Sequence, residues 1–126
     1  CDIDPSSVWT VRPVRMSIVG TNWDTTSPPD VFVELWCPAT ATTVSYTTST
    51  VQDAQDAQWA AGGCNVTAGQ LLASGFDFST SDRDLVGSEV IQPRTHVTIT
   101  AAELRAGMLN GTTPELSAAT FLFIKQ

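Results

Sequence analysis

Short runs of β-branched and aromatic residues, separated by turn residues, make up most of this chain. In the clearest run, Val14, Met16 and Ile18 alternate with Arg15 and Ser17, so every second side chain falls on one face. A period of two is the pattern of a β-strand with one buried face, and repeated short strands are typical of a β-sandwich. We therefore predict strands within residues 14–18, 31–37, 44–51, 71–76, 85–91, 96–99 and 120–125.

One short helix is predicted near the C-terminus. Thr100 and Glu103 have the spacing of a capping box, in which each side chain binds the backbone N–H of the other residue. Residues 104–108 would continue this helix, and Asn110-Gly111 would end the turn. The 126 residues are enough for one domain with a two-layer core. We predict an all-β fold, an antiparallel eight-stranded β-sandwich over residues 8–126, preceded by a polar tether of residues 1–7.

The chain is strongly acidic, because 13 aspartate and glutamate residues are set against six basic residues, for a net charge of -7. Lys125 is the only lysine, so the sequence has no basic stripe for phosphates, and we expect no nucleic-acid partner. The same charge would repel anionic lipid head groups unless a cation lay between them. No apolar run approaches the roughly 20 residues of a membrane-spanning helix.

The three cysteines predict an oxidising compartment. Cys1 stands first in the sequence, as the lipidated cysteine does in a processed bacterial lipoprotein, and we expect it to anchor the chain to a membrane of the bacterial cell envelope. Cys37 and Cys64 then remain as an even pair, which predicts a disulfide in the periplasm or outside the cell. The alternative is that Cys1 carries no lipid and that the other two cysteines are buried free thiols.

Two acidic segments lie between the predicted strands. Asp24 and Asp30 bracket one loop that leads into the strand at 31–37, and a second loop is predicted over residues 77–84. Calcium prefers about six to eight oxygen ligands from carboxylates, carbonyls and water, so two acidic loops at one end of a sandwich could form a site. The alternative is that aspartate and serine occur in loops because their side chains bond turn backbones.

Taken together, these segments resemble the C2 domain, the β-sandwich found in protein kinase C and synaptotagmin. Asp24 and the strand start Asp30-Val31-Phe32-Val33-Glu34-Leu35 are similar to the first calcium loop of that family, where an aspartate precedes an Asp-Pro-Tyr-Val type strand start. Asp77-Phe78-Ser79 and then Asp84-Leu85-Val86-Gly87 resemble its Asp-x-Asp and Asp-x-Ile-Gly motifs. Residues 50–59 are similar to the connection between them, and the resemblance covers residues 11–91.

The resemblance implies a calcium site whose ligands are four aspartates, namely Asp24, Asp30, Asp77 and Asp84. Ser79 stands where the family has its second loop aspartate, so we expect weak binding. Asp82 could supply the missing carboxylate, or could instead pair with Arg83 or take no part in the site. The lysine-rich strand of the family is absent, so the resemblance does not imply recognition of inositol lipids.

The sequence carries no catalytic motif that we can identify. His96 is the only histidine, which excludes a zinc site with several imidazoles, and it lies in a predicted strand. The chain has neither a Gly-x-Ser-x-Gly elbow nor a phosphate-binding glycine loop. We expect a non-catalytic protein, and the sequence identifies no small-molecule substrate. Two functions remain open: a calcium-binding adhesion or docking module on an envelope lipoprotein with a protein partner, and a calcium-independent structural subunit of a larger envelope assembly.

Overall fold

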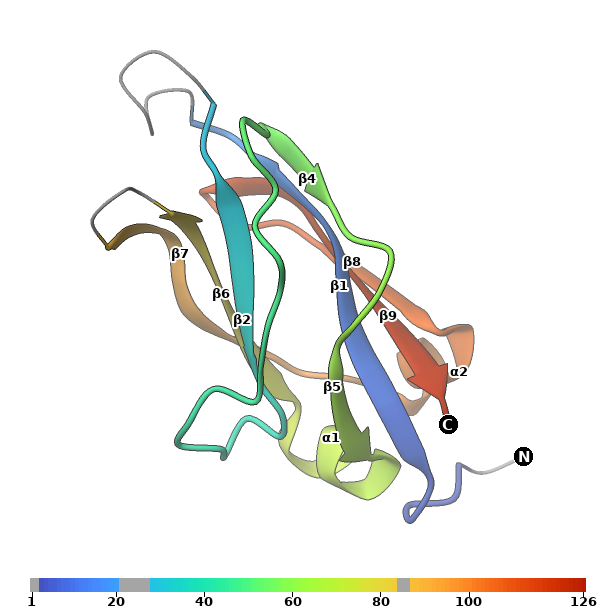
Figure 1. Cartoon of the computed structure of the whole chain (residues 1–126). Helices are drawn as coiled ribbons and strands as arrows, with labels where there is room; N and C mark the ends of the chain where they lie inside the picture. The colour runs from blue at the N-terminus through green and yellow to red at the C-terminus, as the bar shows by residue number, and fades with distance from the viewer. Residues whose placement is uncertain (1–2, 21–27, 84–86) are drawn as a thin grey trace.

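Two antiparallel sheets packed face to face form the computed structural model, which describes residues 3–20, 28–83 and 87–126 (Figure 1). Sheet A consists of β1 (Val8–Ile18), β4 (Asp56–Gln58), β5 (Cys64–Thr67), β8 (Met108–Gly111) and β9 (Leu116–Lys125). Sheet B consists of β2 (Val31–Trp36), β3 (Tyr46–Thr47), β6 (Phe76–Arg83) and β7 (Ser88–Val97). The strand orders are β4–β1–β9–β8, with β5 also paired to β1, and β3–β2–β6–β7. This architecture confirms the predicted all-β sandwich.

Strand β1 shows how the period of two produces a buried face. Met16 and Ile18 are buried as the alternation predicts, but a register shift between Pro13 and Arg15 leaves Val14 only partly buried. A bulge of this kind bends a strand and moves the following side chains to the other face. The described residues form nine strands, whereas eight were predicted. The short strands β4, β5 and β8 were missed because three or four residues are too few to show a period.

Phenylalanine side chains join the central strands of the two sheets. Phe76 of β6 packs edge-on against Phe121 of β9, with ring centroids 4.8 Å apart, and Phe78 of β6 lies 5.2 Å from the same ring. All three side chains are almost completely buried. Edge-to-face pairs of this type add roughly 0.5 to 1.5 kcal/mol to the burial of the rings. These rings lie at the centre of the core, between β6 and β9.

Two short helices, α1 (Ala68–Ser74) and α2 (Ala101–Ala106), connect strands. Helix α2 confirms the predicted capping box of Thr100 and Glu103. Helix α1 shows that the strand predicted at 71–76 is wrong, because Thr67 and Gln70 form a second capping box. Gly75 ends α1 with φ 70°, and a Cβ at this position would lie 2.1 Å from the Val97 carbonyl oxygen. Among the described residues, no helix is long and apolar enough to cross a membrane.

The acidic segment predicted as a loop at 77–84 is instead mostly strand β6, so this prediction is wrong. Strand β6 lies between β2 and β7, and both neighbours hydrogen-bond with its backbone. A polar strand is stable in this position because the ladder satisfies its N–H and C=O groups. The strands predicted at 85–91 and 96–99 contribute to one strand, β7, which tolerates Pro93 because it is an edge strand.

The predicted disulfide is confirmed. Cys37, directly after β2, is bonded to Cys64, the first residue of β5, with a Cα–Cα distance of 6.4 Å. Both cysteines are buried. Because β2 belongs to sheet B and β5 to sheet A, the bond joins the two sheets at the end of the sandwich that also carries α1 (Figure 1).

Part of the predicted tether is packed against the domain. The carbonyl oxygens of Ser7 and Pro5 accept the N–H groups of Ala68 and Gly69, both at 2.9 Å. These two bonds satisfy N–H groups in the first turn of α1, which have no partner within a helix. Residues 5–7 therefore cap α1.

Candidate binding site at the acidic end of sheet B

Three chain segments meet at one end of sheet B, and Asp30 joins them. The backbone N–H of Asp30 donates to Asp82 Oδ1 near the end of β6 at 2.9 Å. Asp30 Oδ1 accepts the N–H of Asp53, in the β3–β4 connection, at 2.9 Å, and the Asp30 carbonyl accepts the N–H of Arg83 at 2.7 Å. Because Asp30 directly precedes β2, these bonds hold β2, β6 and the β3–β4 connection in fixed positions.

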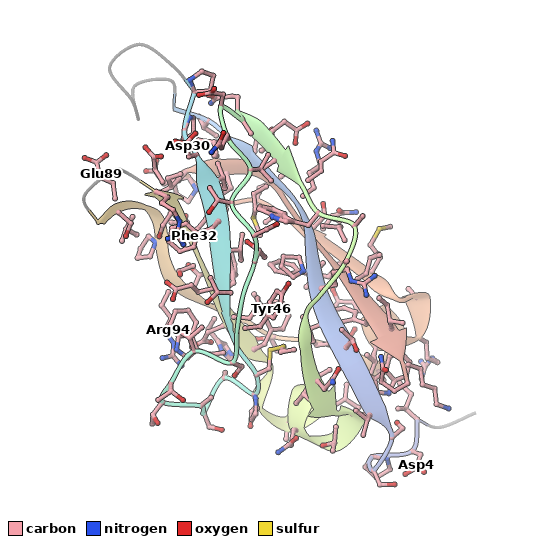
Figure 2. The ribbon with its side chains drawn as sticks, viewed as in Figure 1. Asp4, Asp30, Phe32, Tyr46, Glu89 and Arg94 are labelled. Atoms are coloured by element: carbon pink, nitrogen blue, oxygen red, sulfur yellow. A yellow bond between two sulfur atoms is a disulfide. The ribbon has the colours of Figure 1, made fainter. Side chains whose placement is uncertain are left out.

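Negative charge predominates where these segments meet. Asp82 lies opposite Glu89 in the β6–β7 ladder, and Figure 2 shows Asp30 and Glu89 at the same end of the sandwich. We call this part of the surface the acidic end and define it by its four carboxylates, Asp30, Asp53, Asp82 and Glu89. Carboxylates gathered in this way produce a local negative potential that attracts cations.

One arginine borders the acidic end. The guanidinium of Arg83 lies 4.4 Å from the centroid of the Phe32 ring, and its Nε donates to Thr50 Oγ1 at 3.0 Å. These contacts place the Arg83 side chain between the Phe32 ring and Thr50. In the described part of this end, four carboxyl groups stand against one guanidinium, so acidic side chains predominate.

The four carboxylates differ in burial. Asp82 is fully buried, Asp30 is partly buried, and Asp53 and Glu89 are exposed. Asp53 has φ 52°, a left-handed conformation that aspartate tolerates in turns. Sequence analysis missed Asp53 as a member of this site. The signal that could have found it is an aspartate, a residue favoured in turns, shortly after the predicted threonine-rich strand at 44–51. The acidic end therefore combines the buried Asp82 and partly buried Asp30 with Asp53 and Glu89, whose side chains reach solvent.

Asp77 does not belong to this end, which corrects the prediction that it converges with Asp30. In the β2–β6 ladder, Asp82 lies opposite Val31 and Asp77 lies opposite Trp36. Five residues of strand separate these two positions, a distance of about 17 Å. Ser79 lies opposite Glu34, between the two ends. The prediction was wrong because it placed these residues in one loop, whereas an extended strand carries them apart.

Asp77 forms an ion-pair cluster at the opposite end of sheet B. Its Oδ2 accepts Arg94 Nε at 2.6 Å, and its Oδ1 is 2.9 Å from His96 Nδ1. The Arg94 guanidinium also donates to the carbonyl oxygens of Ala39 and Ala41, at 3.0 and 2.9 Å, and lies 4.4 Å from the centroid of the Trp36 ring. Sequence analysis missed Arg94, because nothing in its local pattern indicates a partner 17 residues away.

Solved structures of other proteins share this fold. One of them, described as the structure of a C2 domain, aligns over 95% of this chain and 96% of its own, with a TM-score of 0.62 and 11% sequence identity. The chain has a C2-like fold. Human GIVD cytosolic phospholipase A2, in complex with methyl gamma-linolenyl fluorophosphonate, aligns with 97% of the C2-like domain at a TM-score of 0.63 and 20% identity. The chain spans 17% of that protein.

Sequence comparison adds no family assignment to the C2-like domain. No family model matches the sequence, and no curated protein matches it. At 11% and 20% identity, the structural similarity establishes the fold, and residue roles have to be argued from this chain itself.

Some predicted positions of the C2-like domain lie outside the described residues, namely Asp24, Asp84 and the predicted lipidation site Cys1. Within residues 3–20, 28–83 and 87–126, no group of three or more histidine, cysteine, aspartate or glutamate residues is arranged to hold a metal ion. Of the predicted ligands in these ranges, Asp30 and Asp82 are the two that the fold brings together. A calcium ion at the acidic end would need further oxygens.

Proposed function

We propose that this chain is a non-catalytic C2-like binding module of the bacterial envelope, which uses its acidic end to bind calcium weakly and to contact a protein or a membrane surface. The observation that carries the proposal is the 2.9 Å hydrogen bond from Asp30 N to Asp82 Oδ1. This bond keeps Asp30, directly before β2, and Asp82 of β6 at the same end of sheet B. Asp53 and Glu89 add exposed carboxylates there.

Electrostatics favours a divalent cation at such a place. Like charges held close together repel, and a bound cation removes this repulsion while accepting oxygen ligands. In the proposed site, Asp24 and Asp84 contribute with Asp30 and Asp82, as the resemblance to the C2 domain implies. Backbone carbonyls and water would complete the roughly six to eight ligands that calcium prefers. We expect a dissociation constant of about 10⁻⁴ to 10⁻³ M, the range of extracellular modules.

The disulfide supports a location outside the cytoplasm. Such bonds persist in the periplasm and outside the cell, where thiols are not kept reduced. The Cys37–Cys64 bond is therefore consistent with an envelope protein. Membrane attachment through Cys1 is a separate part of the proposal, and the intact mass of the native protein would reveal the lipid.

A non-catalytic role is supported by the position of the one histidine. His96 binds Asp77 through Nδ1, and Asp77 also binds Arg94, so the imidazole belongs to an ion-pair cluster. This cluster fixes the chain segment that contains Ala39 and Ala41. We therefore assign His96 a structural role.

A second candidate function is a structural subunit of an envelope assembly that binds no calcium. One observation favours it: Asp30 Oδ1 and Asp82 Oδ1 already accept backbone N–H groups. Aspartates often take this role in turns, without any ligand. The two candidates differ in their response to calcium.

Calcium titration into chelator-treated protein separates them. With a dissociation constant of about 1 mM, 10 mM calcium would stabilise the fold by about 1.4 kcal/mol and raise the melting temperature by a few degrees. Asp30→Asn should abolish this rise without unfolding the domain, because the amide oxygen can still accept the Asp53 N–H while one carboxylate is lost.

Asp4→Asn is the matched control. It removes the same charge from an exposed aspartate at the opposite end of the molecule, as Figure 2 shows, so the calcium response should be unchanged. If the unmodified protein shows neither heat of binding nor a melting shift at about 10 mM calcium, above the weak end of the expected range, the structural-subunit function is the better one.

A further inference from the structure

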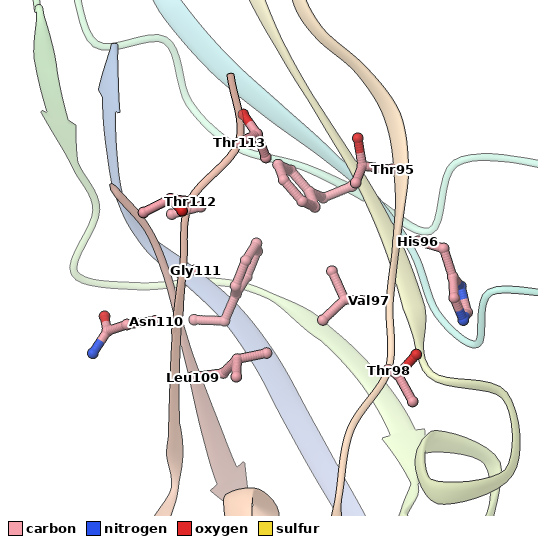
Figure 3. Close-up of a pocket in the computed structure, with 12 residues that line it drawn as sticks. Thr95, His96, Val97, Thr98, Leu109, Asn110, Gly111, Thr112 and Thr113 are labelled. Carbon is pink, nitrogen blue, oxygen red and sulfur yellow. The ribbon is translucent and has the colours of Figure 1, made fainter. Parts of the chain in front are cut away.

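A small pocket opens on the side of the sandwich where β7 of sheet B faces β8 of sheet A (Figure 3). Its volume is about 270 Å³. Residues 95–98 and 109–113 form its two sides, and the buried side chains of Phe78, Ala119 and Phe121 form its inner wall. The pocket involves the C-terminal half of β7, whereas the acidic end involves the first residues of that strand. The two sites are therefore separate.

The pocket exists because two small residues face each other on the inner side of sheet A. Gly111 lies opposite Ala119 in the β8–β9 ladder, and Leu109 lies opposite Phe121. Opposite residues of an antiparallel pair share one face of the sheet. A Cβ added to Gly111 would meet no other atom within 4 Å. A larger residue at position 111 would therefore fill space that the native sequence leaves open.

Most of the pocket surface is apolar. Figure 3 shows Leu109 and Val97 directed into it from its two sides, whereas Asn110 and His96 point away. Asn110 accepts a hydrogen bond from Thr120 at 2.6 Å, and His96 belongs to the ion-pair cluster with Asp77. Among the lining residues, His96 is the one with a titratable side chain. An occupant that complements this surface is apolar and uncharged.

The strands on both sides of the pocket are sheet edges. In the described part of the chain, β8 pairs with β9 alone and β7 pairs with β6 alone. Natural edge strands are protected from further pairing by charges or proline. Strand β7 has such protection in Glu89, Pro93 and Arg94. Strand β8 has none, since its sequence is MLNG and Met108 is 47% exposed. The edge of β8 is therefore open to another strand.

A hydrogen-bonded bridge sets the width of the pocket. Thr113 Oγ1 donates to Gln92 Oε1 at 2.7 Å, and Gln92 Nε2 donates to Thr95 Oγ1 at 2.7 Å. Gln92 belongs to β7 and Thr113 to the β8–β9 connection, so the bridge ties the two sheets together beside the pocket. Since Gln92 is 8% exposed, water competes little for these bonds. The pocket is thus preorganised, which reduces the entropy lost on binding.

We propose that β8 pairs with an extended, uncharged segment of a partner protein, and that one aromatic side chain of this segment enters the pocket beside Gly111. A strand added to β8 would lie about 4.8 Å away, with alternate side chains directed toward sheet B. An apolar cavity of about 150 Å³ can hold benzene, so the larger pocket has room for an indole ring. In this mode of recognition, backbone hydrogen bonds provide affinity and the pocket provides specificity.

Two peptides test the proposal on the complete chain, treated with chelator so that calcium plays no part. One is a blocked, uncharged seven-residue peptide that alternates threonine with valine and has tryptophan at its centre, and the other has alanine there. The tryptophan peptide should shift the amide NMR signals of residues 95–98 and 109–113 and bind at least about tenfold more tightly. Equal binding of the two peptides would overturn the proposal. Binding of free indole without binding of the tryptophan peptide would also overturn it.

Substitutions at Gly111 and Asn110 locate the site. Gly111→Leu should reduce binding of the tryptophan peptide at least about tenfold while the melting temperature stays the same or rises, because the leucine fills an apolar space. Gly111 has no positive φ, so the backbone permits a side chain. Gly111→Ala is a smaller change that should weaken binding partly. Asn110→Leu adds similar bulk to the outer face of β8 and should bind like the native protein. Native affinity in Gly111→Leu would contradict the proposed position.

Discussion

At one end of sheet B, Cys37 is bonded to Cys64 and Asp77 is paired with Arg94 and His96, whereas at the other end Asp30 accepts and donates backbone hydrogen bonds. At the first end, Arg94 neutralises the charge of the buried Asp77, and the disulfide links sheet B to sheet A. The second gathers four carboxylates beside one arginine. Aspartates that look alike in the sequence thus differ in their partners. We infer that the first end stabilises the fold and that the second is available for a ligand.

Removing the disulfide should cause the largest loss of stability and should affect the first end. The bond spans 27 residues, and the chain-entropy model gives about 3.5 kcal/mol for a loop of this length. We expect Cys37→Ser combined with Cys64→Ser to lower the free energy of unfolding by about 3 to 4 kcal/mol, measured by urea denaturation. Any calcium response of the double variant should persist if it remains folded, because the acidic end is held by separate hydrogen bonds. A loss below about 1 kcal/mol would contradict the assigned role.

Arg94→Ala tests the ion-pair cluster and should have an intermediate effect. The Asp77 side chain is 13% exposed and the Arg94 side chain 37% exposed, so solvent partly screens the interaction. We expect a loss of about 1 to 2 kcal/mol, because the Asp77 carboxylate and two backbone carbonyls lose a charged donor. Thermal and urea denaturation would measure it.

Arg15→Ala provides the matched comparison for Arg94→Ala. Arg15 and Asp56 form an ion pair at 2.9 Å in which the side chains are 47% and 40% exposed. Exposed pairs of this kind contribute little, so the loss of stability should be clearly smaller than in Arg94→Ala. Equal losses of stability in the two arginine variants would show that the Asp77–Arg94 pair stabilises the fold no more than an exposed surface ion pair does.

The smallest effect is expected at Asp4, which lies at the same end of the molecule as α1 (Figure 2). Hydrogen bonds from the backbone N–H and then the hydroxyl of Ser6 lower the pKa of Asp4 from its ordinary value of 3.8. Because the folded-state pKa is the lower one, the stability that this interaction contributes is present above pH 3.8 and is lost as the pH falls through the folded-state pKa.

An NMR titration of the Asp4 carboxyl group would measure this pKa. Ser6→Ala should bring the pKa back toward 3.8, because the hydroxyl donor is lost while the backbone N–H remains. Titration of the native Asp4 at or above 3.8 would argue against the hydrogen bonds from Ser6 to its carboxylate.

Local signals in the sequence were reliable where a short segment decides its own conformation. The capping box of Thr100 and Glu103 predicted α2, and the alternation around Met16 predicted β1. The same capping signal is present in Thr67 and Gln70, but the apolar residues that follow were interpreted as a strand. Helix α1 could have been predicted, because the cap and the glycine at its end are both local features.

The polar composition of β6 predicted a loop, and here no local signal was sufficient. Serine, threonine and aspartate are tolerated in β6 because β2 and β7 pair with its backbone on both sides. The composition of β6 does not reveal this pairing. A strand places residues about 3.3 Å apart along one direction, so Asp77 and Asp82 end at different places. Of the predicted calcium ligands that the structure describes, Asp30 and Asp82 were therefore brought together and Asp77 was not.

The sequence by itself determined the all-β class, the negative charge and the α2 cap, because each depends on composition or on residues near one another in the chain. Tertiary structure decided which aspartates share an end, which arginine neutralises Asp77, and that Gly111 opposite Ala119 leaves a pocket between two sheet edges. The physical reason is register. Pairing between strands distant in the sequence sets which side chains meet, and the register depends on the whole set of neighbours.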